Sequence, residues 1–289
     1  GRSEGSRPDA AGKERTAMHP ALDFLNRPGQ ILAMIHVGAL PGTPQYAGSL
    51  AAILERAAAE AAVYRDAGVD ALLVENMHDV PYLNRAVGPE ITAAMTVAAQ
   101  AAARAGGLPT GVQILAGANR EALAAALAAG CAFIRAEGFV FGHIADEGYI
   151  DACAGELLRY RRAIGAEAVA ILADVKKKHS SHAVTADVDI VETARAAEFF
   201  AADGVIVTGV ATARETDPEE LAAVRGAVSV PVLVGSGVTE ANVDRYLPHA
   251  HGLIVGSHFK ADGRWDRPVD ADRLRRFMDR VRALRERGR

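Results

Sequence analysis

Histidine and carboxylate side chains follow directly after short apolar runs of this sequence. Six of the nine histidines do so: His36, His78, His143, His179, His182 and His258. Three of the same runs also carry an acidic residue at or near their end, namely Glu75, Glu137 or Asp174. Imidazole and carboxyl groups are the side chains that most often transfer protons near neutral pH. A fold that brings the ends of these runs together would therefore hold the groups needed for acid–base chemistry.

Two glycine-bearing junctions indicate a phosphate site. Gly235-Ser236-Gly237 follows the seventh apolar run, and Gly256-Ser257 follows the eighth. Backbone N–H groups beside glycine can approach an anion closely, and barrel enzymes often bind phosphate at these two loops. We therefore expect the amides of these five residues to bind a phosphate group. The alternative is that Gly235-Ser236-Gly237 is only a tight turn.

The segment from Asp174 to His182 carries three consecutive lysines. Such a run is usually a solvated surface, but this one follows an apolar run that would end inside a barrel mouth. Residues two apart share a face of an extended chain, so we expect Lys176 and Lys178 to point the same way, with Asp174 deeper on that face. Together with His179, these lysines would neutralise a second anionic group such as pyrophosphate. The alternative is an electrostatic rim or a contact between subunits.

Eight apolar runs, each followed by an Ala-rich amphipathic stretch, set the predicted architecture. The runs span residues 31–38, 69–76, 110–117, 132–138, 168–176, 204–209, 231–237 and 252–257. Their starts lie about 32 residues apart, which is the length of one βα unit of a barrel. The predicted helices span residues 50–67, 89–106, 119–129, 148–164, 187–202, 217–226, 239–247 and 270–287. We therefore predict an α/β protein with a single (β/α)8 TIM barrel over residues 29–289.

Residues at the expected ends of the helices support these predicted elements. Asp217, which precedes a proline, has the residue type and position of a helix N-cap. Gly68, Gly130 and Gly204 are expected to end helices in the left-handed conformation. The competing architecture, a doubly wound open sheet, would show GxGxxG after its first strand, and residues 36–42 do not match that motif.

Residues 1–28 lack an apolar period and mix basic with acidic side chains. Such a segment buries too little apolar surface to offset the entropy of ordering it, so we predict a disordered arm or extension. A transit peptide is disfavoured because such leaders are normally poor in acidic residues. Met18 is a candidate natural start, in which case residues 1–17 are an extension.

The composition disfavours several classes of protein. With 32 Lys+Arg against 36 Asp+Glu, the net charge of −4 gives no general attraction to nucleic acid or anionic lipid. The two cysteines, Cys131 and Cys153, form no CxxC pair, which favours a reducing compartment over disulfides or a thiolate zinc site. No apolar run approaches the roughly 20 residues needed to cross a bilayer. We expect a cytoplasmic homo-oligomer without nucleic-acid or membrane partners.

Five ordered motifs give the sequence a specific resemblance. They are MIHVGALPGTP at 34–44, GVDALLVEN at 68–76, ADVKKKHSSH at 173–182, DGVIVTG at 203–209 and VLVGSGVTEANV at 232–243. Together they resemble the BtpA/SgcQ family over nearly all of residues 30–285. The resemblance implies a TIM barrel of the phosphate-binding type. The family takes its names from a photosystem I biogenesis factor and a gene region for carbohydrate use, so the resemblance supports the fold and implies little about mechanism.

We weigh three functional hypotheses. In the first, an enzyme acts on a phosphosugar at its anomeric carbon, most simply by glycosyl transfer to or from a nucleobase-like acceptor. The second is a phosphosugar isomerase, epimerase or aldolase, for which Lys176 would be the candidate Schiff-base lysine. The third is a non-enzymatic photosystem I assembly factor that uses the barrel as a scaffold. The gathering of histidines and acids at one face favours an enzyme, and two separate anion sites favour glycosyl transfer.

These hypotheses assign roles to particular residues. The expected catalytic residues are Glu75, Asp174, His36, Lys176 and His179. The expected substrate contacts are Asn76, Gln113, Arg135, Glu137, Lys178, Thr208, Gly235, Ser236, Gly237, Gly256 and Ser257. Glu75 and Asp174 are also the candidate ligands of Mg²⁺, because carboxylates and substrate phosphates suit that ion. We expect a small phosphorylated substrate and no organic cofactor.

Overall fold

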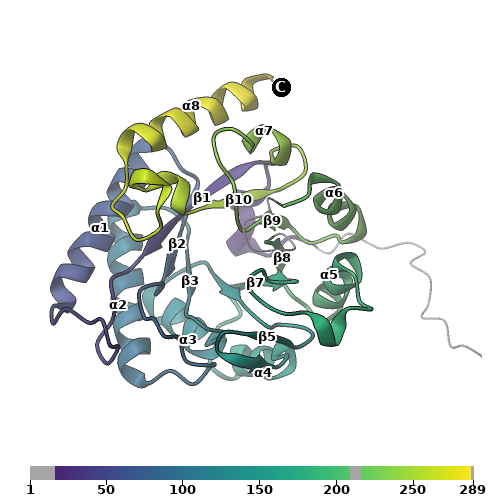
Figure 1. Cartoon of the computed structure of the whole chain (residues 1–289), viewed down its shortest axis with the longest axis horizontal. Helices are drawn as coiled ribbons and strands as arrows, with labels where there is room; N and C mark the ends of the chain where they lie inside the picture. Colours follow the sequence, from purple (N-terminus) through teal and green to yellow (C-terminus); the bar gives the residue numbers. More distant parts are fainter. Residues whose placement is uncertain (1–16, 209–215, 288–289) are drawn as a thin grey trace, which may run out of the picture.

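The computed structural model, which describes residues 17–208 and 216–287, is a closed barrel of parallel strands surrounded by helices (Figure 1). Around the barrel the strands run in the order β1-β10-β9-β8-β7-β4-β3-β2. Their bounds are β1 Gln30–His36, β2 Ala71–Glu75, β3 Thr110–Gln113, β4 Phe133–Ala136, β7 Ala170–Val175, β8 Gly204–Val207, β9 Val232–Val234 and β10 Gly252–Val255. The predicted (β/α)8 barrel is confirmed.

The helices form the outer layer of the barrel. Their bounds are α1 Leu50–Ala67, α2 Pro89–Gly106, α3 Asn119–Ala129, α4 Ala154–Ala163, α5 Ile190–Phe199, α6 Pro218–Ala227, α7 Val243–Tyr246 and α8 Ala271–Arg287. Every residue of the eight barrel strands is buried, as expected for parallel strands that are covered on both faces. Side chains alternate between the layer under the helices, such as Ile31, and the barrel interior, such as Leu32.

Helix ends follow the predicted signals at most positions. Gly68 ends α1 and Gly130 ends α3, with φ of 83° and 73°. The Asp217 carboxylate accepts the backbone N–H of Glu219 at 2.8 Å and so caps α6. Gly204 was wrongly predicted as a helix end: it starts β8, where a Cβ would lie 2.6 Å from Leu172 Cδ2. Ala201 instead takes the left-handed conformation after α5, with φ of 61°.

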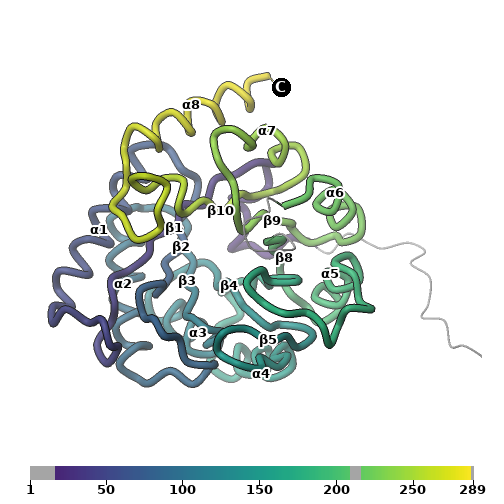
Figure 2. Tube along the Cα trace, viewed as in Figure 1, coloured from purple at the N-terminus to yellow at the C-terminus, as the bar shows by residue number. Residues whose placement is uncertain are grey.

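A turn of 3-10 helix, η1 at Pro20–Leu25, closes the barrel at the N-terminal ends of its strands. Leu22 and Leu25 are fully buried in the barrel interior, and the Phe24 ring lies 5.9 Å from the Phe133 ring. Figure 2 shows this purple start of the described chain inside the ring of helices. The prediction of a disordered arm over residues 1–28 is therefore wrong for this turn, which is too short to show a helical period. Residues 1–16 lie outside the described part of the chain.

The structure also differs from the prediction in the segment between β4 and α4. The predicted helix over 148–164 begins with a hairpin of β5 His143–Ala145 and β6 Gly148–Ile150, and α4 starts only at Ala154. Ile144 and Ser181 exchange backbone hydrogen bonds of 3.1 and 2.6 Å. The hairpin thereby joins the loop after β4 to the loop after β7. The predicted helices over 187–202 and 239–247 are also shorter in the structure, where they are α5 and α7.

Candidate active site

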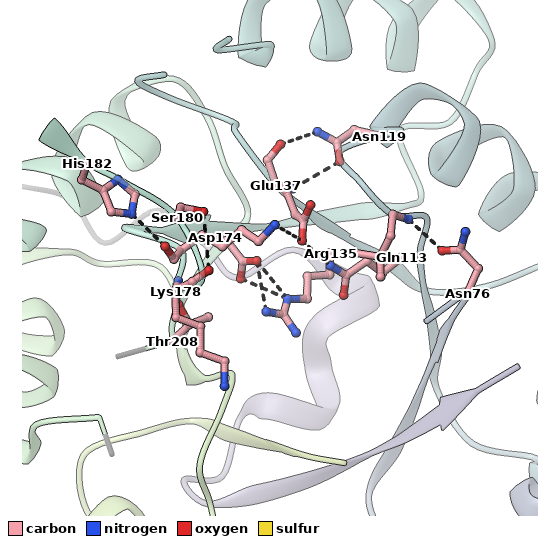
Figure 3. A network of polar contacts seen from close by, with 12 residues as sticks. Asn76, Gln113, Asn119, Arg135, Glu137, Asp174, Lys178, Ser180, His182 and Thr208 are labelled. Carbon is pink, nitrogen blue, oxygen red and sulfur yellow. Dashed lines mark hydrogen bonds and ion pairs between the residues drawn. The ribbon is translucent and has the colours of Figure 1, made fainter. Parts of the chain in front are cut away.

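One half of the barrel mouth is built on ion pairs. Arg135 in β4 donates from Nε to both carboxylate oxygens of Asp174 in β7, at 3.0 and 3.1 Å, and Nη2 adds a third bond of 3.1 Å. Figure 3 shows the two side chains facing each other at the centre of the network. Both are almost fully buried. Burial raises the pKa of Asp174 above its usual value, and the positive charge of Arg135 opposes that shift.

Glu137 lies beside this pair and contacts one lysine and two side-chain amides. Its Oε1 contacts Lys177 Nζ at 3.1 Å and accepts a bond of 3.0 Å from the Gln113 amide. The Asn119 side chain fixes the Glu137 backbone through bonds of 2.7 and 3.2 Å (Figure 3). Glu137 Oε2 and Gln113 Oε1 are buried, and neither has a hydrogen-bond partner among the described residues. Unpaired buried oxygens of this kind are costly unless a ligand binds them.

Lys178 extends the positive charge toward the loop after β9. Its backbone N–H donates to Thr208 Oγ1 at 3.0 Å, and its ammonium donates to Ser236 Oγ. Burial lowers the pKa of Lys178, and the nearby Arg135 charge lowers it further. We call Arg135, Glu137, Asp174, Lys177 and Lys178 the ionic side of the mouth.

Two predicted catalytic residues take other positions. Lys176 has a φ of 47°, so the chain does not stay extended after β7, and its ammonium donates to the Thr185 carbonyl at 2.8 Å. The predicted alignment of Lys176 with Lys178 is therefore wrong, and Lys177 is the lysine that reaches a mouth carboxylate. His179 has a φ of 57° and is exposed, and its side chain makes no hydrogen bond with another described residue.

The glycine-bearing loops differ in detail from the predicted phosphate cradle. The Gly235 amide donates to Val207 O at 2.8 Å and is not free, which corrects that part of the prediction. A Cβ at Gly235 would lie 2.5 Å from Ile206 Cγ2, so glycine is required here for close packing. In the described chain, the amides of Ser236, Gly237 and Ser257 have no backbone acceptor. These three amides remain candidates for an anion site, and Ser236 also contacts the Lys178 ammonium.

The other half of the mouth is formed by neutral and aromatic groups. His36 ends β1 and Glu75 ends β2, and His36 Nε2 lies 3.4 Å from Glu75 Oε2. His36 Nδ1 donates to the Trp265 carbonyl at 3.1 Å, which fixes the tautomer and leaves the Nε2 lone pair toward Glu75. A Cβ at Gly256 would lie 3.3 Å from His36 Cε1, so this glycine leaves room for the imidazole.

Burial sets the charge state of the His36–Glu75 pair. It lowers the pKa of His36 to about 3, with the charge of Lys260 as the next cause, so the ring is neutral. It raises the pKa of Glu75 to about 7, although Arg135 opposes the shift. Glu75 is therefore a carboxyl group that gains and loses a proton near neutral pH, which is the property of a general acid or base.

Trp265, in the loop between β10 and α8, is a mouth residue that the sequence did not single out. Its ring centroid lies 6.2 Å from that of His36 and 4.8 Å from that of His78. His78 is held by a bond of 2.8 Å from Nδ1 to the Val37 carbonyl. We call His36, Glu75, His78 and Trp265 the aromatic side of the mouth. The one available signal was that this is the single tryptophan of the chain and lies in the loop after the last predicted strand.

Several residues that the sequence marked as candidates for chemistry hydrogen-bond or pack within the protein. Asn76 accepts the Leu115 N–H at 2.7 Å and donates to Asp79 at 2.8 Å, so both ends of its amide hold loops together. His258 Nε2 accepts the Glu240 N–H at 3.2 Å, and its ring packs on Phe277. His143 and His182 lie ring to ring at 5.6 Å, next to the ionic side.

The two residues predicted to bind Mg²⁺ have other interactions in this structure. Both oxygens of Asp174 accept bonds from Arg135, and burial favours the protonated form of Glu75. Within residues 17–208 and 216–287, no group of three or more His, Cys, Asp or Glu side chains is placed to hold a metal ion. A magnesium ion bound here would therefore depend on substrate phosphates as well as protein carboxylates, and the Mg²⁺ site stays a prediction.

Comparisons with known proteins agree with the fold. The model of the BtpA family matches residues 27–283. A Caenorhabditis elegans protein, F13E9.13, whose name includes the word mitochondrial, is 50% identical over 88% of this chain and 94% of its own. The photosystem I biogenesis protein BtpA of Synechocystis is 34% identical over 86% of each chain. Thiamine phosphate pyrophosphorylase from Pyrococcus furiosus has a similar fold, with a TM-score of 0.55, 14% identity and coverage of 91% and 99%. Among the described residues, no helix has the length and apolar character needed to span a membrane.

Proposed function

We propose that this chain, which belongs to the BtpA family, is an enzyme that acts on a phosphosugar at its anomeric carbon. The reaction is transfer of the sugar phosphate to or from a nucleobase-like acceptor. One observation carries the proposal: a carboxyl group with a pKa of about 7, Glu75, shares the mouth with a cluster of cations and free amides. Such a mouth provides a proton acceptor and an anion site for one substrate.

The ionic side suits the charged ends of the substrate. Arg135 and Lys178 stabilise the negative charge that develops on a departing pyrophosphate. The amides of Ser236, Gly237 and Ser257 would hold the terminal phosphate of the sugar. This division places the two charged groups of a 1-pyrophosphorylated sugar phosphate on neighbouring parts of the mouth, because Lys178 also contacts Ser236.

The proposed step balances in charge and protons. The bond between the anomeric carbon and the pyrophosphate oxygen breaks, and its electron pair leaves on pyrophosphate. A ring nitrogen of the acceptor forms the new bond to that carbon. The proton from this nitrogen passes to the carboxylate of Glu75, whose pKa of about 7 suits both directions of the transfer.

A purely structural role, which the name of the Synechocystis relative suggests, is less well supported. A scaffold gains nothing from leaving Glu137 Oε2 and Gln113 Oε1 buried without a partner. Each such atom costs about 1–3 kcal/mol of stability, which a bound substrate would return by hydrogen bonding. These two atoms favour a ligand-binding mouth over a scaffold.

Calorimetry with two ligands tests the transferase proposal. We expect 5-phosphoribosyl 1-pyrophosphate to bind at least about tenfold more tightly than ribose 5-phosphate, because charge-assisted hydrogen bonds contribute about 1.5–3 kcal/mol. Lys178→Ala should remove most of this preference. Lys176→Ala is the matched control, since its ammonium bonds to Thr185 instead. The affinity for the pyrophosphate should weaken as salt rises.

Equal affinities for the two ligands in all three proteins would contradict glycosyl transfer. They would favour the second candidate, a phosphosugar isomerase, epimerase or aldolase. The lowered pKa of Lys178 supports that alternative, because a less protonated amine can attack a carbonyl carbon. Lys178 then replaces Lys176 as the candidate Schiff-base lysine.

A further inference from the structure

We infer that the Trp265 and His78 rings form a stacking subsite for the acceptor, and that the acceptor is an uncharged planar heterocycle with an N–H group. The inference rests on the proposed function and deepens it, because it places the second substrate. The sequence and the family comparison assign no role to either ring.

The backbone of Trp265 and the ring of His78 each hydrogen-bond to a neighbouring segment. The carbonyl of Trp265 accepts the His36 N–H at 3.1 Å, and the imidazole of His78 donates to the Val37 carbonyl at 2.8 Å. The first bond ties the loop after β10 to the end of β1, and the second ties the loop after β2 to the residue that follows β1. The His78 ring is fixed directly by its bond, and the Trp265 ring packs on it with centroids 4.8 Å apart, so a flat molecule can bind with little loss of side-chain entropy.

The position of the rings puts a stacked acceptor next to the proton-transfer group. Trp265 contacts His36 at ring distance, with centroids 6.2 Å apart and the planes at 78°. His36 Nε2 in turn lies 3.4 Å from Glu75 Oε2. A heterocycle on Trp265 would therefore lie on the same side of the mouth as the carboxyl group that would take its N–H proton, with His36 in contact with both residues.

Charge and polarity indicate which heterocycle fits. On the aromatic side the buried His36 ring is uncharged near pH 7, whereas Arg135, Lys177 and Lys178 lie on the ionic side. Met77, the neighbour of His78 in the sequence, packs with Tyr82 on an apolar cluster that contains Leu115. This surface suits the π-face of an uncharged ring, and base–aromatic stacking depends little on ring identity.

The single tryptophan of the chain gives a direct measurement. The intrinsic fluorescence of the protein, saturated with ribose 5-phosphate, is titrated with adenine, uracil and hypoxanthine as probes. We expect at least one of them to quench the emission of Trp265 saturably. Cyclohexanol, which has no π-face, is the matched negative control.

Ring variants separate stacking from folding. Trp265→Phe should retain binding of the heterocycle in calorimetry, and Trp265→Leu should weaken it about tenfold. The bond to His36 comes from the backbone carbonyl of residue 265, so both variants keep it. His78→Leu should also weaken binding while leaving the tryptophan available as a probe.

The outcomes distinguish this inference from the proposed function. If ribose 5-phosphate binds but none of the three heterocycles quenches the emission, the stacking subsite is wrong and the phosphosugar site stands. Equal binding to wild type and Trp265→Leu likewise overturns the subsite. If neither ribose 5-phosphate nor 5-phosphoribosyl 1-pyrophosphate binds, the proposed function itself fails.

Discussion

The ionic and aromatic sides of the mouth each hold a buried carboxyl group at the end of a strand, yet the two groups have opposite surroundings. Asp174 accepts three hydrogen bonds from a guanidinium, whereas Glu75 lies 3.4 Å from an imidazole that burial keeps neutral. Burial raises the pKa of both acids. The partner therefore decides which acid stays charged for binding and which can exchange a proton.

The largest expected effect is on catalysis from the aromatic side. Glu75→Gln keeps the size and hydrogen-bonding capacity of the side chain but cannot accept the proton. We expect kcat and kcat/KM for pyrophosphate release from 5-phosphoribosyl 1-pyrophosphate to fall together by about 10²–10⁴. A change confined to KM would show that Glu75 only binds substrate and would remove the contrast between the two sides.

The next effect concerns the stability of the ionic side. Arg135→Met leaves Asp174 buried without its partner and should lower the free energy of unfolding by about 3–5 kcal/mol. The double variant Arg135→Met with Asp174→Leu should recover most of this loss, because it buries no unpaired charge. Chemical denaturation measures both. An equally unstable double variant would mean that packing, and not charge pairing, dominates this side.

The smallest expected effect is the contribution of Glu75 to the pH dependence of the free energy of unfolding. Its pKa is about 7 in the folded chain against an ordinary value of 4.5. Between these values the unfolded chain releases the proton while the folded chain keeps it, so this contribution is present below pH 4.5 and is lost as pH rises through 7. The loss is about 3 kcal/mol.

A variant isolates this pH effect from the other titrating groups. His36 has the opposite trend, because its pKa falls from 6.5 to about 3 on folding and so favours the folded state as pH rises. The quantity to measure is therefore the unfolding free energy of Glu75→Gln minus that of wild type. It should increase from pH 4.5 to 7, and a flat difference would contradict the raised pKa.

The sequence predicted the barrel because its signals are local and repeated. Apolar runs and capping residues such as Asp217 depend on near neighbours in the chain, and they were placed correctly. Active sites of such barrels lie at the C-terminal ends of the strands. This regularity correctly predicted that Glu75, Arg135, Glu137 and Asp174 share one mouth. These features follow from strand direction alone.

What the sequence did not predict depends on contacts between distant loops. The positive φ of Lys176 turns its side chain toward Thr185, and an assumption of extended chain cannot foresee that turn. Trp265 reaches His36 across 229 positions of sequence. Whether Gly235 has a free amide depends on its bond to Val207 in the neighbouring strand. Such contacts exist only once the barrel has closed.

The η1 turn, which closes the far end of the barrel with Leu22 and Leu25, has a kinetic consequence. Above these leucines the barrel interior is packed with apolar side chains, so we expect both substrates to enter and leave at the mouth. If the proposed sugar phosphate binds deeper than the acceptor, it binds first and its product leaves last. Steady-state kinetics should then show an ordered mechanism.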